Sequence, residues 1–230
     1  MVDYSVEEAV SMVKILTAGI GITHILWGVA LTLDYSMFTH RLGNPLVYVP
    51  IHMATGILLV AGRIIYGSAL SAGILTYYWL YVKPLEPIAE PQSVGLVGIS
   101  AGILLQELRP RDGWPLFLLR GGLAYPFMEW GLDAYKNPYH FHSYISTNTV
   151  TKSLITVVDP YLLIALLSIY EIGLAVWLLS GLYPKLSSYA TLFTLITFSA
   201  VAGYPLALPQ NIALAATAYT LANSKINSSS

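Results

Sequence analysis

Apolar segments follow one another along nearly the whole chain, and several approach the ~20 residues that are needed to cross the hydrocarbon core of a bilayer. Only 10% of the 230 residues are charged, whereas soluble domains carry about 25%. A chain with so few charges cannot form the usual polar surface of a soluble protein. We therefore predict an all-α polytopic bundle of the cell membrane that is surrounded by membrane lipid.

We expect eight transmembrane helices. Their predicted boundaries are 12–33, 46–64, 66–82, 94–108, 114–132, 160–183, 186–201 and 206–222. The second and third helices should meet in a tight turn at 63–67, and the sixth and seventh in another at 183–185. A Pro-Gln pair lies just before the fourth segment and another near the start of the eighth. A partly re-entrant path is the alternative for both segments.

The two halves of the chain show an internal repeat. The coinciding pairs are Pro91-Gln92 with Pro209-Gln210 at a shift of 118, Gly62 with Gly181 at a shift of 119, and Trp27-Gly28 with Trp130-Gly131 at a shift of 103. We predict two four-helix units, of which 1–108 is the degenerate copy and 109–230 the better preserved one. Because each unit has an even number of helices, both share one orientation and their relating axis lies along the membrane normal.

Charge and cysteine content exclude several classes of function. The net charge of -1 gives no reason to expect a nucleic-acid partner. The chain has no cysteine, which excludes disulfides, thiolate catalysis and cysteine-ligated iron–sulfur or zinc centres. The first residues, MVDYSVEEAV, lack the positive region of a signal peptide, so we expect no cleavage.

The distribution of Lys and Arg favours a cytoplasmic position for both termini. With the N-terminus inside, the inner basic residues are Lys14, Arg63, Arg109, Arg111, Lys185 and Lys225, and the outer ones are Arg41, Lys83, Lys136 and Lys152. The inner side therefore holds the larger number. The segment 133–159, a predicted polar loop, should then face outward.

Three charged residues lie inside predicted membrane segments. Arg120 and Glu129 fall in 114–132, and Glu171 lies near the middle of 160–183. Because the hydrocarbon core offers no water, such residues usually face the bundle interior and mark function. Glu171 is a candidate for proton exchange, with a structural hydrogen bond as the alternative. Arg120 lies about 14 Å from Glu129 along a helix, so it either lines a polar pocket or extends to the interface.

The second half carries two helix motifs. The first consists of an Arg, a small residue, an aromatic residue, a Gly and an Asp, here Arg120, Ala124, Phe127, Gly131 and Asp133. The second is a Glu before a Gly-rich apolar run, here Glu171, Gly173 and Gly181. Together, over about residues 114–222, they resemble the DoxX/DoxD family of four-helix membrane proteins, which implies the same fold.

That family includes the membrane subunit of archaeal thiosulfate:quinone oxidoreductase, which belongs to sulfur metabolism and the respiratory chain. The resemblance implies that thiosulfate is oxidised and that its electrons pass to quinone. It implies that Glu171 and Glu129 handle protons and that Arg120 attracts the anion or a quinone oxygen. The outer segment 133–159 would bind a second oxidoreductase subunit or a terminal oxidase.

Four side chains are expected beside a bound quinone, namely His24, His52, Tyr170 and Trp130. In the repeat, His52 corresponds to Glu171, which predicts one polar position at equivalent depth in each unit. Two histidines on different helices could also ligate a haem. Hydrogen bonding within the bundle is the simpler interpretation of both.

His140 and His142 occur in the segment YHFHSY. An HxH pair can hold a metal ion when it lies on an extended strand. No third ligand is visible at a suitable spacing, so we predict no metal site here. An aromatic segment at the level of the lipid headgroups explains the pattern better.

Two other functions fit the sequence. A non-catalytic scaffold or assembly subunit of a respiratory complex is consistent with the absence of cysteine and of any cofactor motif. A small-solute transporter is consistent with the repeat and with charged residues inside membrane segments.

Overall fold

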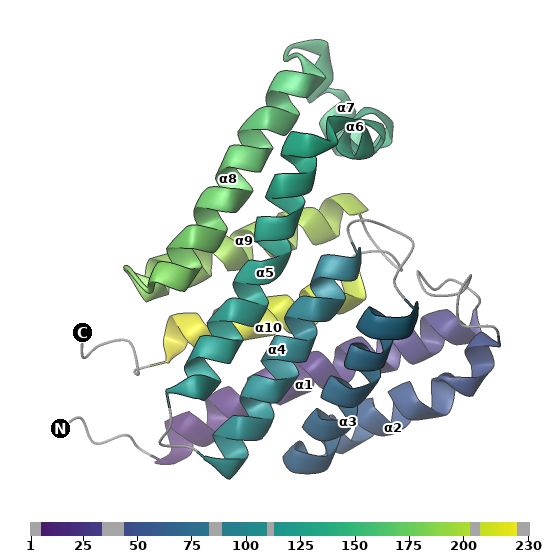
Figure 1. Cartoon of the computed structure of the whole chain (residues 1–230), viewed down its shortest axis with the longest axis vertical. Coiled ribbons are helices and arrows are strands. Elements are labelled where there is room, and N and C mark those ends of the chain that lie inside the picture. The colour runs from purple at the N-terminus through teal and green to yellow at the C-terminus, as the bar shows by residue number, and fades with distance from the viewer. Residues whose placement is uncertain (1–5, 34–43, 83–88, 110–112, 203–207, 225–230) are drawn as a thin grey trace.

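The structure is a computed structural model, and it describes residues 6–33, 44–82, 89–109, 113–202 and 208–224. Within these ranges every regular element is a helix, which confirms the all-α prediction (Figure 1). The α-helices are α1 (Val6–Thr32), α2 (Val49–Val60), α3 (Ile64–Tyr77), α4 (Ala89–Leu108), α5 (Trp114–Lys136), α6 (Pro138–Thr147), α7 (Thr149–Lys152), α8 (Pro160–Ser180), α9 (Pro184–Ala202) and α10 (Leu208–Asn223). Three short elements are η1 (Pro45–Val47), the π-helical turn η2 (Tyr78–Val82) and η3 (Leu154–Thr156).

Local sequence determines where α8 begins and ends. The Asp159 carboxylate accepts hydrogen bonds from the backbone N–H groups of Tyr161 and Leu162, at 2.9 and 3.0 Å, and so caps the first turn. Pro160 occupies the first helical position, where its missing N–H is not needed. The helix ends at Gly181, whose φ of 69° is the left-handed conformation that glycine adopts without strain.

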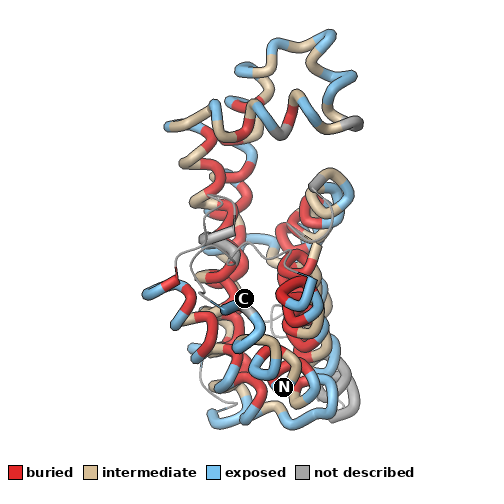
Figure 2. The backbone as a smooth tube through the Cα atoms, turned by 90° about the vertical axis from the view of Figure 1, so that its right-hand side faces the viewer, coloured by how far each residue is buried: buried red, intermediate tan, exposed pale blue. Residues whose placement is uncertain are grey.

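Helices that follow one another in the chain also pack against one another. The contacts run from α1 to α2, α3, α4, α5 and α8, and then through α9 to α10. Because α10 packs closely against α1, the bundle closes on itself. In Figure 1, α5 and α8 run side by side, and their ends project with α6 and α7 beyond the other helices. Figure 2 shows buried stretches along the helices with exposed positions alternating on their outer sides.

Glycines allow close approach at two helix crossings. A Cβ atom added to Gly122 on α5 would clash with the carbonyl oxygen of Gly95 on α4. A Cβ atom added to Gly56 on α2 would lie 2.6 Å from the carbonyl oxygen of Gly21 on α1. Small residues at such contacts are typical of helices that pack in membranes.

The two predicted tight turns are present, with one glycine of positive φ at each. Gly62 (φ 75°) follows α2, and Gly181 (φ 69°) follows α8. Both residues occupy equivalent places in the predicted repeat. The two segments for which a re-entrant path was the alternative are continuous helices of 20 residues in α4 and 16 residues in α10.

The prediction of eight membrane-spanning helices is met only in part. Within the described residues, two helices are both long and apolar enough to cross a bilayer by themselves, Val13–Thr32 and Pro160–Ser180. The apolar helices Val49–Val60 and Ser93–Leu108 are shorter. α5 has sufficient length, but it carries the charged residues Arg120, Glu129, Asp133 and Lys136. Helices therefore occupy the predicted places, while their length and polarity vary.

The prediction of a polar loop at 133–159 is wrong. α5 continues to Lys136, and α6, α7 and η3 occupy most of the remaining segment. Pro138 begins α6, at a position where proline favours a new helix, so YHFHSY is helical. Four of the residues used to predict orientation, Arg41, Lys83, Arg111 and Lys225, lie outside the described residues.

Gly122→Ala and Gly121→Ala form a matched pair of variants on α5. We expect Gly122→Ala to lower the free energy of unfolding by about 1–3 kcal/mol, because the new methyl group overpacks the contact with Gly95. No packing atom lies within 4 Å of a Cβ atom at Gly121, so Gly121→Ala should be neutral or raise stability by up to ~1 kcal/mol. Thermal unfolding in one detergent compares them. Equal melting temperatures would show that the close α4–α5 approach is unnecessary.

Candidate functional site

Five buried side chains in the N-terminal half form a continuous series of hydrogen bonds, which we call the histidine chain. Ser100 Oγ lies 2.8 Å from Ser71 Oγ, and Ser71 Oγ lies 2.8 Å from His24 Nε2. His24 Nδ1 lies 2.9 Å from His52 Nδ1, and His52 Nε2 lies 2.6 Å from Tyr78 OH. All five residues have a solvent exposure of 0%.

Every helix of the N-terminal half contributes to the histidine chain. His24 lies on α1, His52 near the start of α2, Ser71 on α3 and Ser100 on α4. Tyr78 is the first residue of the π-helical turn η2 that prolongs α3. Single π-helical turns occur frequently at functional sites, because they change the direction in which the following side chains point.

The indole of Trp27 covers both imidazoles from the side of α1. Its ring centroid lies 5.5 Å from that of His24 and 5.7 Å from that of His52, in edge-on orientation. The indole N–H donates to Gln210 Oε1 of α10 at 3.3 Å. The site is thus connected to the C-terminal half through a residue of the second Pro-Gln pair. The side chain of Gln92, in the first pair, lies outside the described residues.

The contact between His24 Nδ1 and His52 Nδ1 holds one proton, because one nitrogen must donate and the other must accept. When His24 Nδ1 donates, its Nε2 accepts from Ser71 and His52 Nε2 donates to Tyr78. When His52 Nδ1 donates, Tyr78 donates to His52 and His24 donates to Ser71. The neutral histidine chain therefore has two states, which differ in the direction of every hydrogen bond and leave no ring nitrogen unsatisfied.

This arrangement suits proton transfer over short distances. The atoms at each step are within the reach that general acid–base chemistry requires. All four ring nitrogens of His24 and His52 are hydrogen-bonded to side chains, so neither ring presents a nitrogen to a haem iron. Hydrogen bonding within the bundle, the simpler of the two interpretations, agrees with the geometry.

Glu171 faces the interior of the C-terminal half, as its position in the sequence suggests. The residue is 1% exposed, and its Oε2 has no hydrogen-bond partner among the described residues. Among the described residues, no polar group of α5 therefore hydrogen-bonds this oxygen. Ser168, one turn earlier, instead donates to the carbonyl oxygen of Gly131 on α5 at 2.7 Å. Since an unpaired buried carboxylate is costly, the protonated acid is the form that these surroundings accommodate.

Arg120 and Glu171, which the sequence suggests as partners in one site, lie far apart. A Cβ atom added to Gly181 would lie 2.8 Å from the guanidinium of Arg120. Gly181 lies ten residues beyond Glu171, about 15 Å along a helix. Arg120 is thus at the C-terminal end of α8, where the helix dipole favours a cation. Glu129 is half-buried on α5.

The four residues expected beside a quinone do not form one group. His24 and His52 belong to the histidine chain. Trp130 is buried in the C-terminal half, with its ring centroid 5.5 Å from that of Phe127. Tyr170 is 45% exposed, and its hydroxyl lies 2.6 Å from Thr194 Oγ1 of α9. Tyr170 therefore joins α8 to α9 near the surface.

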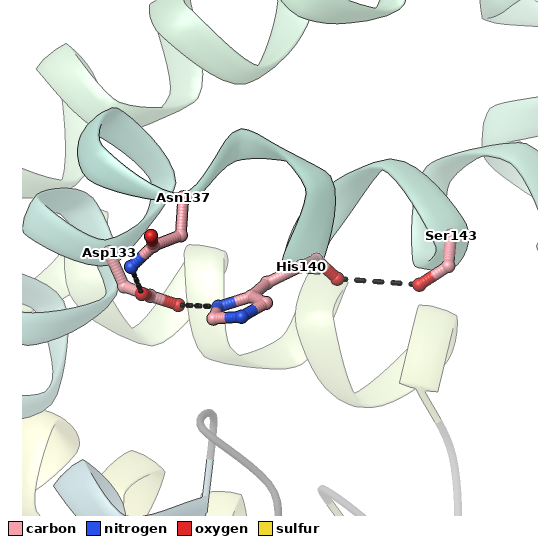
Figure 3. Close-up of polar contacts among 4 residues, drawn as sticks. All are labelled: Asp133, Asn137, His140 and Ser143. Atoms are coloured by element: carbon pink, nitrogen blue, oxygen red, sulfur yellow. Dashed lines mark hydrogen bonds and ion pairs between the residues drawn. The ribbon is translucent and has the colours of Figure 1, made fainter.

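A second polar cluster lies where α5 passes into α6 (Figure 3). Asp133 Oδ2 lies 2.8 Å from His140 Nδ1, and Asp133 Oδ1 accepts from Asn137 Nδ2 at 2.8 Å. His142 stacks instead on Tyr161 of α8. The HxH pair is split because residues two apart on a helix do not face each other. Within the described part of the chain, no group of three potential metal ligands is found.

Three members of the histidine chain, Ser71, Tyr78 and Ser100, are missed by the sequence analysis. Serine is common in apolar helices, so neither serine stands out. Ser71 and Tyr78 are seven residues apart, which places them on one helix face two turns from each other. That spacing, beside two histidines on neighbouring helices, is the signal that could have identified them.

No family model, no curated protein and no solved structure matches the chain. The functional argument therefore rests on the geometry of these side chains and on the motifs of the sequence.

Tyr78→Phe tests whether the hydrogen bonds of the histidine chain contribute to stability. The change removes the hydroxyl that lies 2.6 Å from His52 Nε2. We expect a loss of about 1–3 kcal/mol in the free energy of unfolding, because a buried ring nitrogen is left without a partner. The neighbouring Tyr77→Phe removes an exposed hydroxyl and should change stability by less than ~0.5 kcal/mol. Thermal unfolding measures both, and equal effects would contradict a role for the buried hydroxyl.

Proposed function

We propose that the protein is a membrane-embedded subunit of a quinone-linked oxidoreductase and that it exchanges protons through buried polar side chains. The observation that carries this proposal is the histidine chain. It consists of five side chains, and every helix of the N-terminal half contributes at least one. Hydrogen bonds join them without a gap, and all five are shielded from solvent. Ionisable side chains inside an apolar bundle are rare, and they mark proton relays in many membrane proteins.

The outer surface of the bundle supports a position in the membrane. On α8, Leu162, Leu166 and Ile169 are all more than half exposed, and on α9 Phe193 is 72% exposed. Contiguous apolar surface is unfavourable in water but suits contact with lipid. We propose that α1–α5 and α8–α10 are eight membrane helices arranged as two units like those of the DoxX/DoxD family. The shorter and more polar helices would be accommodated through their packing against the longer ones.

The donor and the acceptor of electrons follow from the resemblance to the DoxX/DoxD family. Thiosulfate is the proposed donor and quinone the proposed acceptor. Reduction of a quinone to a quinol consumes two electrons and two protons. On this proposal a second subunit or a terminal oxidase docks at the projecting end that carries α6 and α7. The membrane subunit described here contributes the proton-exchanging groups.

A non-catalytic scaffold is the second candidate function. The observation in its favour is that the histidine chain is saturated and closed, because every ring nitrogen already has a partner. A fully satisfied polar network can hold four helices in one arrangement without moving a proton. The two candidates therefore differ in whether turnover depends on the imidazoles.

Quinone reduction tests the proposed function directly. We expect the protein, extracted from membranes and purified in a mild detergent, to reduce a short-chain quinone analogue when thiosulfate is added. His52→Gln keeps a side chain that hydrogen-bonds but removes a titratable ring, so turnover should fall by roughly 10²-fold. Gly121→Ala, which lies in open space on α5, serves as the control and should keep the parent rate.

Two results would contradict the proposal. One is a parent protein that co-purifies with an oxidase or dehydrogenase but shows no thiosulfate-dependent reduction, which favours the scaffold. The other is equal turnover of His52→Gln and the parent at matched expression, which would remove the imidazole from proton exchange.

A further inference from the structure

We propose that the histidine chain is the single working site of the protein, and that the C-terminal half is a diverged copy of the same four-helix unit in which this site is reduced to Glu171. The structural part of this inference depends on the register of buried residues in the two halves. The functional part rests on the proposed function, because it concerns where protons are exchanged.

The first helices of the two halves bury the same positions. Leu16, Ile20, His24 and Trp27 of α1 correspond to Leu119, Leu123, Phe127 and Trp130 of α5, and all eight are buried. The packing at the following glycines corresponds too. A Cβ atom at Gly28 would meet Met53 of α2 at 2.9 Å, and one at Gly131 would meet Ile172 of α8 at 2.7 Å. Met53 follows His52 directly, and Ile172 follows Glu171.

The remaining helices continue this register. Buried residues of α2 are His52, Thr55, Gly56 and Leu59, and their counterparts in α8 are Glu171, Leu174, Ala175 and Leu178. Ser68, Ser71 and Leu75 of α3 correspond to Ser188, Thr191 and Leu195 of α9. Leu96, Ile99 and Ser100 of α4 correspond to Leu214, Thr217 and Ala218 of α10. The shift is 119 between α2 and α8, 120 between α3 and α9, and 118 between α4 and α10. Each residue turns a helix by about 100°, so a slip of one residue within any one of these pairs would destroy its agreement.

The contacts between the two halves repeat as well. A Cβ atom at Gly122 of α5 would clash with Gly95 of α4, and one at Gly98 would lie 3.2 Å from Gly122 Cα. At the corresponding place, a Cβ atom at Gly19 of α1 would clash with Ala216 of α10. Because α5 meets α4 as α1 meets α10, an approximate two-fold axis relates the halves. The closed order of helix contacts follows from this relation.

The polar side chains are what distinguish the two halves. Phe127, Phe198 and Ala218 occupy the places of His24, Tyr78 and Ser100, so three hydrogen-bonding groups are replaced by apolar ones. Thr191 occupies the place of Ser71, and its hydroxyl donates to the carbonyl oxygen of Ser187 within its own helix. Glu171 is thus left among apolar replacements and a threonine that bonds within its own helix, which explains why its Oε2 has no hydrogen-bond partner among the described residues. The continuous route for protons therefore exists in the N-terminal half.

The experiment transfers the core of the C-terminal half into the N-terminal half. The recoded variant combines His24→Phe, His52→Glu, Ser71→Thr, Tyr78→Phe and Ser100→Ala. The permuted control has the same amino-acid composition as the recoded variant. It exchanges the first two substitutions, so that it carries His24→Glu and His52→Phe, and it keeps the other three. Thermal unfolding and thiosulfate-dependent quinone reduction are measured for the parent, for both variants and for the control Gly121→Ala.

We expect the recoded variant to fold with a melting temperature about 10 °C or more above that of the permuted control, because only the recoded variant places its carboxyl group where the shared backbone accommodates one. Turnover should fall by roughly 10²-fold or more in the recoded variant and stay near the parent value in Gly121→Ala, whose added methyl group lies in open space.

Equal melting temperatures of the recoded and permuted variants would overturn the duplication. Turnover that survives at the parent rate in the recoded variant would overturn the assignment of the site. If the parent reduces no quinone, the proposed function fails, and the thermal comparison still decides whether the halves share one register.

Discussion

The close approach of α1 and α2 determines what the N-terminal half can hold. Gly21 and Gly56 bring the two backbones together, and Gly28 leaves room for Met53. At this separation His24 and His52 meet through their Nδ1 atoms, 2.9 Å apart. Each imidazole then directs its Nε2 away from the other, toward Ser71 on one side and Tyr78 on the other. Side chains of α3 and η2 thus satisfy both Nε2 atoms in apolar surroundings, and Ser100 of α4 bonds Ser71 in turn.

On the proposed duplication, one backbone arrangement serves two purposes in the two halves. In the N-terminal half it encloses a series of polar groups, and in the C-terminal half it encloses aromatic and aliphatic side chains around Glu171. Helix contacts made by small residues are retained in both, because they depend on the absence of side-chain volume. Polar contacts are lost more easily, since replacing both partners by apolar groups of similar shape is nearly neutral. A duplicated unit can therefore keep its fold while only one copy keeps a continuous site.

The sequence predicts the coarse structure because the coarse structure depends on local signals. Long apolar segments indicate helices, and Gly62 and Gly181 mark the turns at which two of them end. The burial of Glu171 follows from its place in an apolar helix. The segment 133–159 was misjudged because its helices are short and polar, and Pro138 was interpreted as part of a loop when it begins α6.

The histidine chain could be predicted only in part, because its contacts join helices that are distant in the sequence. His24 and His52 stand out as ionisable residues in apolar segments. Whether they meet depends on the angle at which α1 crosses α2, which no local pattern specifies. Ser71, Tyr78 and Ser100 become significant only when the four helices are placed together. Arg120 and Glu171 lie on neighbouring helices and are still far apart, since residues on one pair of helices can lie at opposite ends.

Two buried imidazoles share one proton and form part of a continuous series of hydrogen bonds. ¹⁵N NMR spectroscopy of the protein with labelled histidine can detect this shared proton. We expect the Nδ1 signals of His24 and His52 to be correlated through a common proton, and Tyr78→Phe to shift the signals of both rings. Two independent ring signals that exchange with solvent and do not respond to Tyr78→Phe would contradict it.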